Sequence, residues 1–386
     1  MSNNKMRSSK KNKPKNLNFV EILNLQLIKN DFETIEKIIN ENQPTEGAPI
    51  IFLIILPYLS LSCVEALNIL KEKRILTNIK NNSSHSPETI RNDLKKTMNK
   101  INKIYKGILE IDEEADLKFR NEVKYEFIKT NNLYYNIGFY TDGYHRYISN
   151  TQYMESIIRE ADDKDIEISK SMHQLGIFLG ECTKSITTLL KPVKLTEFTV
   201  PIKTDVEIFY KDMHTDNLGH IDGLDKAQIL FLIHTLATLN GVKNLLSTIL
   251  PQENTYLFRI KYIVTYYAYC GLEKFKNNII NKNIDYSSEM KDLINLIDEI
   301  KADRDTYFNG DFRSCMMHYS LKNKGVFIID QKLLNQELPF YGLIESCFNG
   351  KHFDEQNVVI TNLMNKLSSA LEKTISLNLD DSKILE

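Results

Sequence analysis

The stretch AQILFLIHTLATLNGVKNLL, residues 227–246, gives the clearest indication of the fold. Its apolar residues are almost continuous, and Asp225 stands just before it in the position of a helix N-cap. This pattern predicts a helix buried in the protein interior. Because His234 lies within the apolar run, we expect it to be a hydrogen-bonded core histidine.

Further segments of the C-terminal half show helical patterns. They are YLFRIKYIVTYYAYCGLEKF, EMKDLINLIDEIKAD, the short stretch NGDFRSCMMHYSL (309–321) and an amphipathic segment from about Asp354 to Leu371. KNKG (322–325) ends the short stretch, and the VFIID that follows favours a short extended piece. Together these segments predict a compact antiparallel helical bundle over residues 225–380.

Apolar residues recur at intervals of three and four along residues 18–190, which predicts a second helical domain. Its first two helices are expected to be short, with Asp31 between them as an N-cap. The sequence SPE (86–88) marks the start of a helix that should run on through Ile104. Residues 134–148 are rich in aromatic side chains and contain an Asp-Gly turn, which favours a small β-hairpin.

Residues 191–224 interrupt the helical pattern with two prolines and clustered Asp, His and Gly, so they are expected to link the two domains. Residues 1–17 are basic and contain no acid, which is typical of a disordered, solvated tail. We therefore expect an all-α chain. The domain at 18–190 is expected to sense a signal or bind a partner. The helical bundle at 225–380 is the second domain. Gly (14 residues) and Pro (9) are each about half as frequent as usual, which favours the same class.

The net charge and the cysteines of the sequence indicate where in the cell the protein is expected to be. The net charge of −2 argues against a bulk polyanion binder, and five scattered cysteines without a CxxC motif are typical of a reducing compartment. The apolar run at 50–64 contains Pro57 and is shorter than the about 20 residues of a membrane span, so it predicts a buried helix. The expected location is the cytoplasm, with no membrane association.

The linker contains a possible metal site. His214, Asp216, His220 and Asp222 are residue types that bind divalent cations. The same residues also suit a polar loop in front of a helix, and no second cluster completes a ligand set. A metal hydrolase built on His214 and His220 is therefore a minor alternative, and we expect no metal and no cofactor.

The stretch 309–321 contains the candidate for chemistry, because Arg313 is followed five places later by His318. Such a spacing arises readily by chance. The reason to consider Arg313 and His318 a functional pair is therefore their position in a predicted helical bundle. The helix would begin after Asn309, where backbone N–H groups favour anions. A structural alternative is that Arg313 only forms an ion pair with Asp305 or Asp311. A second alternative is a thiol–imidazole pair of Cys315 and His318, but residues three apart on one helix rarely form the nucleophile and base of a hydrolase.

The HEPN superfamily is marked by an R-x(4–6)-H motif within an all-α bundle, and residues 225–380 of this chain resemble it. Family members often have Asn after the arginine and some have Tyr two places after the histidine, whereas this chain has Ser314 and Tyr319. The resemblance implies a metal-independent endoribonuclease that leaves 2′,3′-cyclic phosphate ends. His318 would move protons and Arg313 would stabilise phosphate charge. The candidates for binding the phosphate are Ser314, Tyr319, Lys322 and Lys324.

The resemblance also implies partners. A five-residue gap separates two side chains by about 140° around a straight helix, so a site shared by the two chains of a homodimer is expected. RNA would be the substrate. Toxin–antitoxin or anti-phage abortive infection would be the setting, with activity gated by the N-terminal half, an antitoxin or an activating partner. The alternative function is a non-catalytic HEPN-like module for dimerisation, interaction or nucleotide binding.

Overall fold

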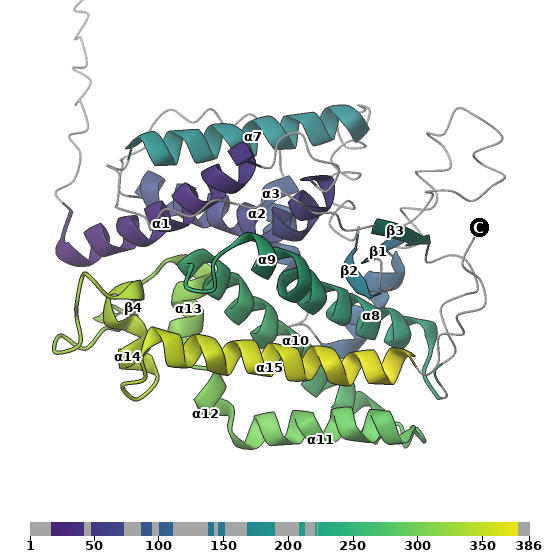
Figure 1. Cartoon of the computed structure of the whole chain (residues 1–386). Coiled ribbons are helices and arrows are strands. Elements are labelled where there is room, and N and C mark those ends of the chain that lie inside the picture. The colour runs from purple at the N-terminus through teal and green to yellow at the C-terminus, as the bar shows by residue number, and fades with distance from the viewer. Residues whose placement is uncertain are drawn as a thin grey trace, which may run out of the picture.

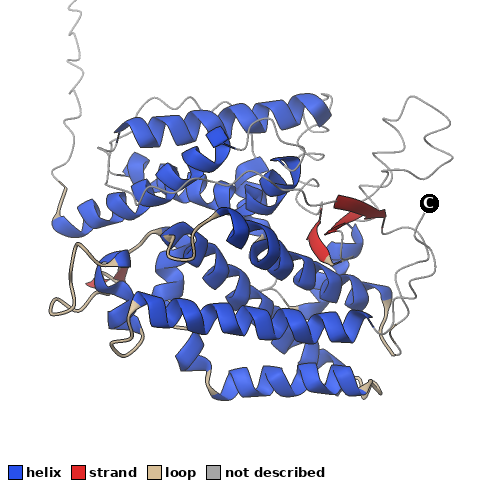
Figure 2. Ribbon diagram, viewed as in Figure 1, coloured by secondary structure: helices blue, strands red, loops and turns tan. Residues whose placement is uncertain are grey.

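The computed structural model describes residues 17–41, 48–72, 86–94, 100–110, 138–142, 146–150, 168–189, 208–212, 221 and 223–376. Within these residues helices predominate, and the strands form two small antiparallel sheets (Figure 2). The expectation of an all-α protein with a small hairpin is confirmed.

The N-terminal half forms a group of helices that lies against the C-terminal half. Its elements are α1 (Phe19–Glu41), α2 (Ala48–Glu72), α3 (Ser86–Asp93), a helix over residues 101–110 and α7 (Ile168–Leu189). Figure 1 shows α7 on the outside, over α1 and α2. In the C-terminal half, α1 contacts α10 (Thr255–Asn281) and α2 contacts α13 (Gly310–His318).

Helix α1 is continuous, so the prediction of two short helices divided at Asp31 was wrong. The reason is that Asp31 does not cap a helix. Its side chain is buried and lies 2.5 Å from the guanidinium of Arg259, on α10. A carboxylate paired in this way has no need of free helix N–H groups.

Helix α3 begins at Ser86 as predicted and ends at Asp93. It does not run on through Ile104, which lies in the separate helix over 101–110. Residues 1–16 of the predicted basic tail lie outside the described residues.

The predicted hairpin is present as β1 (Gly138–Asp142) and β2 (Tyr147–Asn150). A third strand, β3 (Ile208–Asp212), comes from the expected linker and pairs antiparallel with β1. Strand β2 packs against the π-helical turn η2 (Gly241–Leu246), where a Cβ on Gly241 would lie 2.4 Å from the Ile148 carbonyl oxygen. Glycine is therefore required for this close approach.

The C-terminal half begins with a well-capped helix. Asp225 accepts a hydrogen bond from the Gln228 backbone N–H (2.9 Å), and the Gln228 side chain accepts one from the Asp225 N–H (2.8 Å), which completes a capping box. The elements that follow the cap are α8 (Lys226–Asn240), η2, α9 (Ser247–Ile249), α10 (Thr255–Asn281), α11 (Ser288–Ala302), α12 (Arg304–Tyr307), α13 (Gly310–His318), β4 (Lys322–Asn323), β5 (Val326–Phe327), η3 (Pro339–Gly342), α14 (Leu343–Cys347) and α15 (Phe353–Ser376).

Helix α10 is the central element of the fold. It contacts α1, α8, α11, α13 and α15, and nearly all of its first two thirds is buried. Buried apolar residues from both halves, from Leu23 to Ile375, form one continuous cluster. The division of the chain into two domains stays a prediction, while the packing shows that α1 and α2 share a core with α10 and α13.

Two apolar stretches are long enough to cross a membrane by length and composition, Ile51–Glu72 and Lys226–Ile249. Of their most apolar windows, 83% and 78% are buried inside the protein. Core helices of soluble proteins pass the same test, so this is weak evidence for a span. The expected burial of residues 50–64 is confirmed for residues 51 and 54–64, while Phe52 and Leu53 are half-buried.

Candidate functional site

Helix α13, which carries Arg313 and His318, has a fully formed N-cap. The Asn309 side chain accepts hydrogen bonds from the backbone N–H groups of Asp311 (2.9 Å) and Phe312 (3.0 Å). The backbone of Asn309 is held in turn by the Tyr262 hydroxyl. Asn309 therefore occupies two of the N–H groups at this helix end, which leaves fewer donors for the expected attraction of an anion.

The other end of α13 explains the position of Tyr319. This residue has a left-handed backbone (φ 51°), and its N–H donates to the Cys315 carbonyl at 2.8 Å. The turn directs its side chain into the core, where it is 1% exposed and its hydroxyl lies 2.8 Å from Asp31 Oδ2 and 3.0 Å from Ser62 Oγ. Tyr319 is thus inaccessible to a substrate in this structure, and it supports the packing of α13.

The Tyr319 ring belongs to a buried ionic cluster. The Arg259 guanidinium carbon lies 3.8 Å from the centroid of the ring, and Arg259 pairs with Asp31. Burial acts to raise the pKa of Asp31, and its net pKa remains above the usual value although Arg259 and Tyr319 act in the opposite direction. This cluster joins α1 to α10 and to the end of α13.

Arg313 has an aromatic setting and lacks a carboxylate partner among the described residues. One terminal nitrogen donates to the Tyr267 hydroxyl at 3.1 Å, and the guanidinium carbon lies 5.7 Å and 5.9 Å from the ring centroids of Tyr266 and Tyr267. Its Nε is buried without a hydrogen-bond acceptor in the part of the chain that the structure describes. Asp311 instead accepts a hydrogen bond from Asn323, so the expected alternative of an Arg313–Asp311 pair is not present.

His318 contacts the N-terminal half. Its Nδ1 lies 3.0 Å from Glu65 Oε2 of α2, and the His318 side chain is 32% exposed while that of Glu65 is only 8% exposed. The other carboxylate oxygen of Glu65 pairs with a terminal nitrogen of Arg91, on α3. Burial acts to raise the pKa of Glu65, but the contacts with His318 and Arg91 outweigh it and lower the pKa below the usual value.

Tyr267, the partner of Arg313, is also under the electrostatic influence of Arg91. Burial raises the pKa of Tyr267, and the charges of both Arg313 and Arg91 oppose the rise, so both cations act on the same hydroxyl. We call these five side chains the motif cluster: Glu65, Arg91, Tyr267, Arg313 and His318. They come from α2, α3, α10 and α13, and the two halves of the chain build the cluster together.

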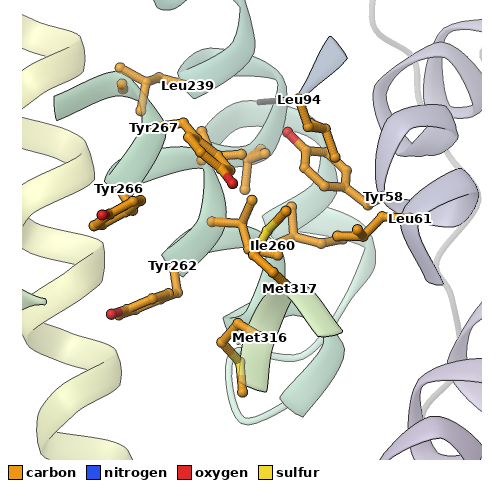
Figure 3. Packing of buried hydrophobic residues seen from close by; sticks show 14 of the residues in the cluster. Tyr58, Leu61, Leu94, Leu239, Ile260, Tyr262, Tyr266, Tyr267, Met316 and Met317 are labelled. Atoms are coloured by element: carbon orange, nitrogen blue, oxygen red, sulfur yellow. The ribbon is translucent and has the colours of Figure 1, made fainter. Parts of the chain in front are cut away.

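Apolar packing fixes the elements that carry the motif cluster. Figure 3 shows Tyr58 and Leu61 of α2 pointing toward Ile260 of α10 and Met317 of α13. All four side chains are buried. Because core side chains pack at close to crystal density, this contact fixes the position of α13 against α2.

The sequence did not point to Glu65 or Arg91. A signal for Glu65 does exist, because it is the first charged residue after the fifteen uncharged residues of 50–64. A carboxylate that continues an apolar helix is buried only where it finds partners. Nothing in the sequence names those partners, since His318 lies in the other half of the chain.

The remaining predicted site residues lie apart from the motif cluster. Lys322 and Lys324 are exposed on the β4–β5 hairpin, and no described contact joins them to Arg313 or His318. Ser314 is half-buried on α13. Cys315 is fully buried and burial raises the pKa of its thiol to about 12, which argues against a Cys315–His318 nucleophile pair.

His214, Asp216, His220 and Asp222, the residues of the possible metal loop, lie outside the described residues. Within the described ranges, no group of three His, Cys, Asp or Glu side chains is arranged to hold a metal ion. His234 is buried in α8 as predicted, and burial lowers its pKa to about 3, so the imidazole is neutral.

Comparison with known proteins gives no match to a family model, to a curated protein or to a solved structure.

Proposed function

We propose that this protein is a metal-independent endoribonuclease of the HEPN type, in which Arg313 and His318 act on one phosphodiester. The observation that supports the proposal is how the side chains of Arg313 and His318 are paired and exposed on α13. Arg313 is half-buried without a described carboxylate partner, and His318 is held at Nδ1 by Glu65 while a third of its side chain is exposed.

The chemistry fits these two groups. A carboxylate accepts but does not donate, so the proton of a neutral His318 lies on Nδ1, and Nε2 keeps its lone pair. Nε2 would accept the proton of an RNA 2′-OH as the O2′–P bond forms and the P–O5′ bond breaks. The 5′ oxygen takes a proton from solvent, and the products are a 2′,3′-cyclic phosphate and a 5′-OH. Arg313 would bind the phosphate oxygens as charge accumulates.

In the proposed setting the activity belongs to a cytoplasmic toxin or anti-phage effector. Its substrate is RNA, and its activity is controlled by the N-terminal half, an antitoxin or an activating partner. The contact of His318 with α2 supports control by the N-terminal half, because a movement of α2 would change the contacts of the base. The homodimer stays a prediction.

One observation favours a second function, a non-catalytic HEPN-like interaction module. His318 contacts α2 of the N-terminal half, and Met317 and Tyr319 on either side of it are buried. In that case the contact of His318 with Glu65 would only join the two halves of the chain, and Arg313 would only pack against α10.

Cleavage of mixed cellular RNA in excess EDTA tests the proposal. The wild type should cleave and leave 2′,3′-cyclic phosphate ends, while Arg313→Ala and His318→Ala should each lose on the order of 10²-fold or more in rate. His173→Ala, an exposed histidine of α7, is the matched control and should cleave like the wild type. Equal cleavage by all four proteins would place the activity elsewhere.

A further inference from the structure

The inference drawn here rests on the proposed function and extends it. We propose that Glu65 is the positioning residue of His318 and that Arg91 is a second phosphate-binding guanidinium. One chain then holds every group of the site, and the N-terminal half contributes two of them.

The position of Glu65 is that of a group that orients an imidazole. Its Oε2 lies 3.0 Å from His318 Nδ1, so it fixes both the tautomer and the direction of the ring. Its Oε1 is taken by Arg91, which keeps the carboxylate from turning away. A glutamate that served only to pack α2 against α13 would be replaced at lower cost by an apolar residue of similar volume.

Arg91 has capacity for a further ligand. Of its three nitrogens, one terminal nitrogen pairs with Glu65 and the other donates to Asn92 at 2.8 Å. Its Nε is buried without an acceptor among the described residues, as is the Nε of Arg313. Arg313 donates to the Tyr267 hydroxyl, and Arg91 is joined through Glu65 to His318, so each incompletely satisfied cation lies next to a group of the motif cluster. A phosphodiester has the charge and the two free oxygens that such a pair binds.

This arrangement removes the geometric difficulty of the motif. Arg313 and His318 project from α13 about 140° apart, so they do not meet on the helix itself. Tyr267 holds Arg313, Glu65 holds His318, and Arg91 pairs with the same carboxylate, so Arg91 adds a second guanidinium next to the partner of His318. A second copy of the chain is not needed to complete the set of charges.

Glu65 is tested by kinetics that separate positioning from folding. Glu65→Gln should lower kcat by on the order of 10²-fold with little change in KM and should alter the pH profile of kcat, while Glu65→Asp should recover part of the rate. The Glu65 carboxylate is the charged group in contact with the imidazole, and Arg91 is the charged group that pairs with Glu65. Glu72→Gln, at the exposed end of the same helix, is the matched control. An unchanged kcat and pH profile in Glu65→Gln would overturn the positioning role.

The tautomer of His318 in the wild type tests Glu65 without any activity. Nitrogen-15 NMR of the histidine rings, with His318→Gln for assignment, should show a neutral His318 protonated on Nδ1, whereas a free histidine prefers the proton on Nε2. An Nε2-protonated His318 would overturn the proposal. If the wild type cleaves no RNA but its His318 is protonated on Nδ1, the proposed function fails and the positioning contact stands.

Arg91 is tested by binding of a 2′-O-methyl RNA, which has the phosphates but no attacking hydroxyl. Arg91→Gln should weaken binding by about tenfold and reduce the slope of log Kd against log salt by about one. Lys106→Gln, an exposed lysine of the helix over 101–110, is the control and should change neither quantity. Unchanged affinity and slope in Arg91→Gln would remove Arg91 from the site.

Discussion

Glu65 Oε2 lies 3.0 Å from His318 Nδ1, and this contact joins the apolar helix α2 to the last residue of α13. It places the histidine of the motif under the influence of the N-terminal half. Every proposal for the site depends on this contact, so its contribution to the free energy of unfolding is the first quantity to measure.

The pH dependence of stability should reveal the ionised state of Glu65. The folded pKa is lowered, so its contacts stabilise the protein fully above the usual pKa of 4.5 and lose that contribution as pH falls through the lower folded value. Urea denaturation of wild type and Glu65→Gln should show a difference on the order of 1 kcal/mol near pH 6 that shrinks below pH 4. A difference that stays constant over this range would mean that the carboxylate charge makes no contribution.

The buried pair of Asp31 and Arg259 should be the most sensitive point in the fold. Asp31→Asn leaves the guanidinium of Arg259 buried without a counter-charge and should destabilise the protein by about 3–5 kcal/mol. The double variant Asp31→Leu with Arg259→Met should be less destabilised than the single one, because neither charge remains to be solvated. Thermal denaturation of the three proteins measures this, and a double variant worse than the single would contradict it.

His234 should make the fold sensitive to mild acid. Burial lowers its folded pKa to about 3, so the unfolded chain binds a proton below the usual value of 6.5 while the folded chain does not. Stability should therefore fall by about 1.4 kcal/mol per pH unit below that value from this group alone. His234→Phe should reduce the slope of unfolding free energy against pH between pH 6 and 4, and His173→Phe, on the surface, should leave it as it is.

Mixing of inactive variants should distinguish a site within one chain from a site shared by two. If Arg313 of one chain served His318 of another, equal amounts of Arg313→Ala and His318→Ala would recover about a quarter of the wild-type activity through mixed dimers. With all groups in one chain, the mixture should remain inactive after co-refolding. Recovery of activity would support the shared site and refute the single-chain proposal.

Local sequence was enough to predict most helices of the C-terminal half. The capping residues Asp225 and Asn309, the apolar periodicity of the segments between them and the break at KNKG (322–325) act over a few residues, so their effect can be read from the chain directly. The hairpin of β1 and β2 was predicted for the same reason, since a short turn fixes its pairing.

The tertiary structure alone decided the continuity of α1, the addition of β3 to the hairpin and the composition of the motif cluster. Asp31 looked like a helix cap because its partner, Arg259, is far away in the sequence, and the same holds for Glu65 and His318. The free energy of a buried charge depends on which opposite charge packing brings near it, and that term is absent from any local pattern. The sequence by itself therefore determined the helices and the motif, while the packing of α2 against α13, and of α3 against α2, determined what surrounds the motif.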